Sequence, residues 1–269
     1  RDEAATRLLA ALEQGVDRRN VVRVNGTVTP VKTRILAGGI HSAKQQVVRI
    51  DRGVRASIDG VMREAFQRAA VRAVTRVDAV LVSDYGSGLI NPRLVAQLRA
   101  AAREDGPVPI LIDTRYRLLE YRGLTASTPN ESEVEQALGI KINDSMRVLE
   151  RAGREILERT RMQAVLMTRG SRGMALFQPG EPTVHIPISG SDEIADVTGA
   201  GDTVMATVAL ALAAGATFEQ AARLANYAGG LVVMKRGTAT VSVTELRNVV
   251  NGHGGRARVQ GRAGKGRRG

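Results

Sequence analysis

The chain alternates short apolar runs with longer amphipathic runs, and this alternation restricts the folds open to it. The apolar runs suit buried strands, and the runs between them have helical periodicity. Strands that alternate with helices build an α/β sandwich around a mostly parallel sheet. The predicted strands are Val77–Val82, Val108–Ile112, Leu124–Ser127 and Ala164–Met167, followed by a β-rich stretch at Met174–Ile188.

A smaller antiparallel unit is predicted near the start of the chain. Three β-like runs at Val21–Val24, Val31–Leu36 and Gln46–Ile50 are separated by Gly, Pro and Asn. Asn91-Pro92 has the residue types that open a helix, an Asn cap followed by Pro in the first turn. The other predicted helices are near Ala4–Leu12, Asp59–Val74, from Asn130, Ser145–Thr160, Thr203–Ala214, Thr217–Met234 and Val243–Val250.

The composition is that of a globular protein of 269 residues with 43% apolar residues. This length supports one core, or one domain with a small appendage. The absence of cysteine excludes disulfides and thiolate metal sites and fits a reducing compartment. No apolar run is long enough to span a bilayer, so we expect a cytoplasmic protein with no membrane partner.

Half of the net charge of +12 lies in the last residues, 252–269, which carry six Arg or Lys and no acid. A basic Gly/Arg segment without a core-forming pattern is most simply a disordered end. Such a tail can also bind nucleic acid through phosphates. No aromatic residue is interleaved for base stacking, and this argues against a nucleic-acid partner.

Residues Asp196–Asp202 read Asp-Val-Thr-Gly-Ala-Gly-Asp and precede an alanine-rich helical run. The small residues Gly199, Ala200 and Gly201 let the backbone approach a ligand closely. A helix that starts there directs unpaired amides and the positive end of its dipole at an anion. Asp202 adds a proton acceptor beside that site, so the string suits phosphoryl transfer to a hydroxyl. The plainer alternative is a Gly-rich turn with a helix-capping Asp.

Four polar residues each follow a predicted strand, at the sheet edge where α/β proteins bind ligands. They are Asp84, Asp113, Asn130 and Thr168. Asp84 and Asp113 either face a sugar or cap the segments that follow them. Asn130 and Glu133 can share a hydrated Mg²⁺ with phosphates, but their spacing is also that of a helix capping box.

The string Asp196–Asp202 resembles the second signature of the ribokinase-like (PfkB) carbohydrate kinases. Further matches follow in the family's order at 82–88, 111–115, 128–133, 168–174, 225–230 and 237–241. They are similar to one branch, the kinase domain of ADP-heptose synthesis, which phosphorylates C1 of D-glycero-D-manno-heptose 7-phosphate. The segments Thr29–Arg34 and Gln46–Asp51 are similar to its lid strands.

The resemblance implies a three-layer sandwich with a small β lid. Residues 1–251 would form the kinase domain, with lid strands at about 21–51, and 252–269 would form the tail. It also implies ATP and Mg²⁺ as cofactors and a sugar phosphate as substrate. We also consider a homodimer formed through the lid.

The same resemblance implies roles for individual residues. Asp202 would be the catalytic base, and the amides of Gly199, Ala200 and Gly201 would form the anion hole. Asn130 and Glu133 would hold Mg²⁺, partly through water. The implied cofactor-binding residues are Asn130, Glu131, Ser132, Glu133, Thr168, Gly170 and Asn226, and the implied substrate-binding residues are Asp84, Asp113 and Arg115.

Two departures qualify the match. Ser87 and Arg115 stand where the branch often has Lys. The family's N-terminal Gly-Gly-x-x-x-Asn sugar-binding segment has no counterpart before Arg1. We therefore expect a truncated copy, or one that has lost activity. The alternatives to a heptose kinase are another PfkB-type sugar kinase and a catalytically impaired nucleotide-binding remnant.

Overall fold

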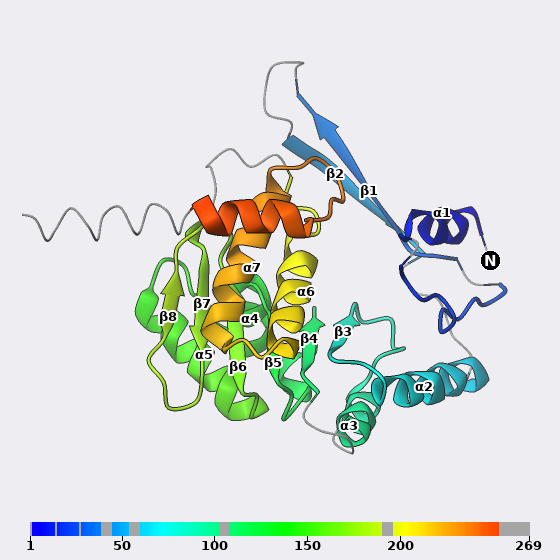
Figure 1. The fold of residues 1–269 in the computed structure, drawn as a ribbon, viewed down its shortest axis with the longest axis horizontal. Coiled ribbons are helices and arrows are strands. Elements are labelled where there is room, and N and C mark those ends of the chain that lie inside the picture. The colour runs from blue at the N-terminus through cyan, green and yellow to red at the C-terminus, as the bar shows by residue number, and fades with distance from the viewer. Residues whose placement is uncertain are drawn as a thin grey trace, which may run out of the picture. The chain divides into compact units, whose positions relative to one another are not determined.

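The computed structural model describes residues 2–13, 15–26, 28–38, 45–53, 60–102, 108–189 and 196–252 (Figure 1). The chain forms two compact units, each described by itself: residues 1–78 with 82–108, and residues 79–81 with 109–269. The predicted disordered tail lies outside the described residues, apart from Gly252. No described helix is both long and apolar enough to cross a bilayer.

The first unit begins with α1 (Glu3–Ala11), which Asp2 caps by accepting a hydrogen bond from Ala5 N at 2.8 Å. Its two-stranded antiparallel ribbon consists of β1 (Val31–Ala37) and β2 (Gln45–Arg52). The prediction of a further strand at Val21–Val24 was wrong. Val21, Val22 and Arg23 are exposed, none of the four residues lies in a described strand, and the ribbon starts at Val31.

Two helices complete this unit. They are α2 (Gly60–Val74) and α3 (Pro92–Ala101). Asn91 caps α3 by accepting from Leu94 N at 3.0 Å, as its position before proline predicts.

A six-stranded sheet has the order β3-β4-β5-β6-β7-β8. Neighbouring strands are parallel from β4 through β6 and antiparallel from β6 through β8. The predicted stretch Met174–Ile188 is therefore two short antiparallel strands. The strand bounds are β3 Val80–Asp84, β4 Ile110–Thr114, β5 Ala126–Ser127, β6 Ala164–Thr168, β7 Met174–Phe177 and β8 Val184–Ile186.

Helices cover both faces of this sheet in the second unit, as the alternation of side chains along the strands requires. Leu166 and Leu176 point into a core with α6 (Ala200–Ala213) and α7 (Phe218–Val233). Met167 and Phe177, their neighbours in sequence, point into a second core with α4 (Glu131–Leu138) and α5 (Met146–Thr160). The three-layer α/β arrangement is thus the predicted one, and a last helical segment covers residues 243–252.

Candidate active site

The turn before α6 is held in place by a carboxylate. Asp196 Oδ1 accepts from Thr198 N at 2.9 Å, and Asp196 Oδ2 accepts from Gly237 N at 3.1 Å, 41 residues away. Gly199 then caps α6 with φ of 79°, a left-handed conformation that favours glycine. A Cβ at Gly199 or Gly201 would meet no atom of the described residues within 4 Å, so the Cβ side of both glycines is open there. The first turn of α6 can therefore receive an anion.

Three carboxylates converge beside this turn. Asp202 is exposed in the first turn of α6, while Asp113 is half-buried in β4. Burial first, and then the negative charges of Glu133 and Asp202, raises the pKa of Asp113 to about 6. The charges of Asp202 from the sequence motif and of Glu133 from the first turn of α4 therefore both act on the strand-end residue Asp113.

The start of α4 is a capping box. Asn130 Oδ1 accepts from Glu133 N at 2.9 Å, and Glu133 Oε2 accepts from Asn130 N at 3.0 Å. Asn130 Oδ1 also accepts from the Ser132 hydroxyl at 2.8 Å. Burial raises the pKa of Glu133, against the lowering effects of Asn130 and Arg115. The structural alternative noted for this pair is therefore realised in the ligand-free chain.

Oxygen donors nevertheless suit Mg²⁺ at this place. Asp113, Asn130 and Glu133 supply carboxylate and amide oxygens, the donor type that Mg²⁺ takes. Burial, and then the negative charges of Glu133 and Asp202, raise the pKa of Asp113, and a cation would offset those charges. Within the described ranges, no group of three His or acidic side chains is close enough to hold a metal ion directly.

A cavity of about 160 Å³ adjoins the first turn of α6. Most of its wall is apolar or glycine, and it includes the predicted residues Thr168, Gly170, Gly201 and Asn226. The remaining wall residues are Gly173, Met174, Ile188, Val197, Ala200, Val204, Gly229, Gly230 and Val233.

Asn226 is 7% exposed, and its Nδ2 donates to the Pro187 carbonyl at 2.8 Å. Its amide nitrogen therefore braces the wall of the cavity. Gly230 is equally constrained, because a Cβ there would lie 2.0 Å from the Ser189 carbonyl oxygen. The family resemblance implies that Asn226 lies near a nucleoside, and in the structure Asn226 lines the wall of the cavity.

Asp84 and Asp196 both use a carboxylate oxygen to accept from the backbone N–H two residues further on. Asp84 belongs to the first unit, is 3% exposed, and accepts from Gly86 N at 2.9 Å, which is the local turn-capping alternative. Asp196 begins the string 196–202, and no function is assigned to it from the sequence. Its spacing to Thr198 is that of an Asx turn, so the hydrogen bond to Thr198 N could have been predicted from the sequence. Its contact with Gly237 is long-range and has no local signal.

Comparison with known proteins agrees with this geometry. A family model described as pfkB family carbohydrate kinase matches residues 1–245. The chain is 41% identical over 247 residues to the bifunctional protein HldE of Geobacter sulfurreducens, covering 91% of this chain and 49% of that protein. The chain thus spans about half the length of the curated relatives it matches.

Solved structures share the fold. A ribokinase from Giardia lamblia superposes with a TM-score of 0.71 at 16% identity, covering 94% of this chain and 80% of that one. A ribokinase from Arabidopsis thaliana, complexed with ribose and ATP, gives a TM-score of 0.59 at 24% identity, with 68% and 58% covered. At these identities the likeness concerns the fold alone.

Proposed function

The chain belongs to the pfkB family of carbohydrate kinases, and from this premise we propose that it transfers the γ-phosphoryl group of Mg·ATP to a sugar-phosphate hydroxyl. The observation that carries the proposal is the placement of Asp202. Its carboxylate stands in the first turn of α6, behind an open glycine turn, and its charge reaches Asp113. A base and an anion-binding helix start therefore occupy one place, which phosphoryl transfer to a hydroxyl requires.

In the proposed reaction Asp202 accepts the proton of the acceptor hydroxyl. The hydroxyl oxygen forms a bond to the γ-phosphorus, the bond from that phosphorus to the bridging oxygen breaks, and ADP leaves. The amides of Gly199–Gly201 stabilise the charge on the transferring group, aided by the positive end of α6.

The cavity beside α6 is the proposed nucleoside site. Its apolar and glycine-lined wall suits a flat heterocycle, and Thr168 and Gly170 lie on the wall near the α4 start. Asn130 and Glu133 would hold Mg²⁺ through water, with Asp113 close by. When bound, Mg²⁺ neutralises phosphate charge. Glu131 and Ser132 remain proposed members of this cofactor-binding element.

The acceptor proposed first is D-glycero-D-manno-heptose 7-phosphate, phosphorylated at C1. Sequence motifs support that choice. One face of the ribbon presents Lys32, Arg34 and Arg49 together with Asp51, which pairs with Arg49 at 3.0 Å. Lys32 Nζ lies 4.3 Å from the centre of the Tyr85 ring. Asp84, Asp113 and Arg115 remain proposed acceptor-binding residues.

The other face of the ribbon supports a homodimer. Its register brings together Ile35 with Val48 and Thr33 with Ile50, and the apolar members of this face are exposed. Exposed branched residues on a two-stranded ribbon are a suitable contact for a second copy. Light scattering should give twice the chain mass for the unchanged protein and one chain mass for Val48→Asp. A cytoplasmic location stays a prediction from the sequence, which has no apolar run long enough to span a bilayer and no cysteine.

Two measurements test the proposed function. The first is titration of the chain with Mg·ATP, and the second is a phosphoryl-transfer assay with heptose 7-phosphate, fructose 6-phosphate and ribose. We expect nucleotide binding and the fastest turnover with the heptose phosphate. Turnover with another sugar alone would favour a different kinase of the family. Binding without turnover in any sugar would favour the nucleotide-binding remnant.

A further inference from the structure

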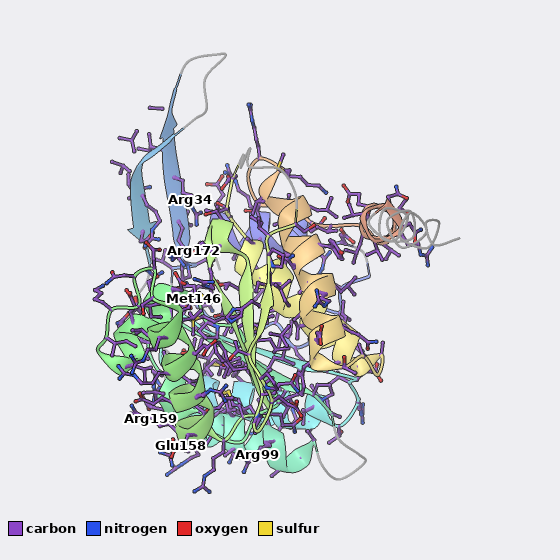
Figure 2. The ribbon with its side chains drawn as sticks, turned by 90° about the vertical axis from the view of Figure 1, so that its left-hand side faces the viewer. Arg34, Arg99, Met146, Glu158, Arg159 and Arg172 are labelled. Atoms are coloured by element: carbon purple, nitrogen blue, oxygen red, sulfur yellow. The ribbon has the colours of Figure 1, made fainter. Side chains whose placement is uncertain are left out.

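An ion-pair network lies beside the nucleotide cavity but outside the proposed reaction. Glu131, in the first turn of α4, accepts from Arg169 Nε at 2.7 Å, and its other carboxylate oxygen pairs with Arg172. The Arg169 and Glu131 side chains are only 8% and 15% exposed. Arg172 also pairs with Asp144, and Figure 2 shows it near Met146, the first residue of α5.

Both arginines belong to the short connection between β6 and β7, which supplies Gly170 and Gly173 to the cavity wall. The backbone of this connection is closed, since Arg169 N donates to the Gly173 carbonyl at 2.9 Å. It is also tightly packed, because a Cβ at Gly173 would lie 2.1 Å from the Ile186 carbonyl oxygen. A residue that fixes the position of this connection therefore also fixes one side of the cavity wall.

The ion pair extends a backbone link between the same two segments. Thr168 N donates to the Pro129 carbonyl at 2.9 Å, and Asn130 bridges Thr168 in parallel register. Glu131 is the next residue after Asn130, and Arg169 is the next residue after Thr168. The pair thus lies between the cavity wall and the start of α4, where Asn130 and Glu133 lie.

We propose that Arg169 and Glu131 are positioning residues for Mg·ATP. Their pairing holds the start of α4 against the end of β6, so that Asn130 and Glu133 keep a fixed place relative to the nucleoside cavity. The inference rests on the proposed function, which assigns nucleotide to that cavity. Both Glu131 oxygens are engaged by arginine, so Glu131 would serve the cofactor-binding element by supporting it.

Glu131→Gln leaves the buried Arg169 charge without this carboxylate, and Arg169→Gln leaves Glu131 paired with Arg172 alone; each change loosens the start of α4 from the end of β6. Residues that support ligand-binding groups typically cost about 10-fold to 100-fold in affinity or activity when replaced. We therefore expect Arg169→Gln and Glu131→Gln each to raise the Kd of Mg·ATP by about that factor. The KM of the acceptor should stay unchanged.

A double-mutant cycle tests the inference. Calorimetric titration with a Mg-bound non-hydrolysable ATP analogue is made on the full chain, the two single variants and the double variant. Residues that act as one unit give a double variant no weaker than the worse single variant. Arg169→Lys, which keeps the charge but loses the fork geometry, replaces Arg169→Gln if the latter does not fold, with the same expectation.

The matched control is the exposed pair Glu219 and Arg223 on α7, 2.7 Å apart, whose replacement by Gln should leave the Kd unchanged. Losses that multiply in the double variant would overturn the inference, because each residue would then contact the nucleotide independently. An unchanged Kd in both single variants would overturn it as well. Failure of the unaltered chain to bind the analogue would instead contradict the proposed function.

Discussion

Asp113 at the end of β4 and Asp202 in the first turn of α6 lie close enough for the charge of one to raise the pKa of the other. They are 89 positions apart in the chain. A carboxylate pair of this kind costs stability when both members are ionised, and it persists where a site needs negative groups. The pair therefore connects the proposed catalytic base to β4, and it makes the free energy of unfolding depend on pH.

Asp113→Asn should stabilise the chain at neutral pH. The pKa of Asp113 rises from 3.8 to about 6 on folding, so its carboxyl binds a proton more tightly in the folded state. Stability is therefore lost as pH rises from about 4 to about 6. The full shift corresponds to at most about 3 kcal/mol.

Thermal unfolding from pH 4 to pH 8, without Mg²⁺, measures this effect. The advantage of Asp113→Asn over the unchanged chain should be near zero at pH 4 and largest above pH 6. Asp78→Asn, at an exposed position, is the control. An advantage that does not vary with pH would contradict the assignment.

Gly201→Ala should separate stability from activity. The added Cβ meets nothing within 4 Å, and Ala is favoured over Gly inside a helix by about 1 kcal/mol. The unfolding midpoint should therefore rise or stay level. Gly201 also lines the cavity proposed for the nucleotide, and the methyl would add bulk to its wall, so the KM of Mg·ATP should rise. A stable variant with unchanged KM would show that no phosphate approaches this turn.

Gly230→Ala should have the opposite signature. Its Cβ would lie 2.0 Å from the Ser189 carbonyl oxygen. This oxygen is a backbone atom, so it cannot move away by a change of side-chain rotamer. Overpacking of this kind typically costs about 1–3 kcal/mol. Urea unfolding should show a lower midpoint than for the unchanged chain, with Gly201→Ala as the matched glycine control. An unchanged midpoint would mean that the wall of the cavity is looser than the structure indicates.

Much of the fold was predictable because its signals are local. The Asn91-Pro92 helix start, the buried strands and the α4 capping box each depend on residues within one turn of each other. Val21–Val24 shows the limit of such signals. Its composition suits a strand, yet a strand also needs a partner, and partners are set by the tertiary structure.

The roles of the named site residues stay predictions, and the contacts between these residues have no signal in the sequence. Motif resemblance named the residues at the start of α6 and along the strand ends, and the structure gathers Asp113, Glu133 and Asp202. The contacts that hold them join residues far apart in sequence. Asp196 to Gly237 and Glu131 to Arg169 are examples, and neither has a periodicity or spacing that a sequence displays.

Turnover by Asp202→Asn at saturating Mg·ATP and acceptor tests the central claim most directly. Asn keeps the shape of the side chain and removes the proton acceptor, so kcat should fall by about 10²–10⁴ while the Kd of Mg·ATP stays within about twofold. The exposed Asp78→Asn variant should match the unchanged chain. Wild-type turnover by Asp202→Asn, in a chain that otherwise phosphorylates its acceptor, would contradict the assignment of Asp202 as the base.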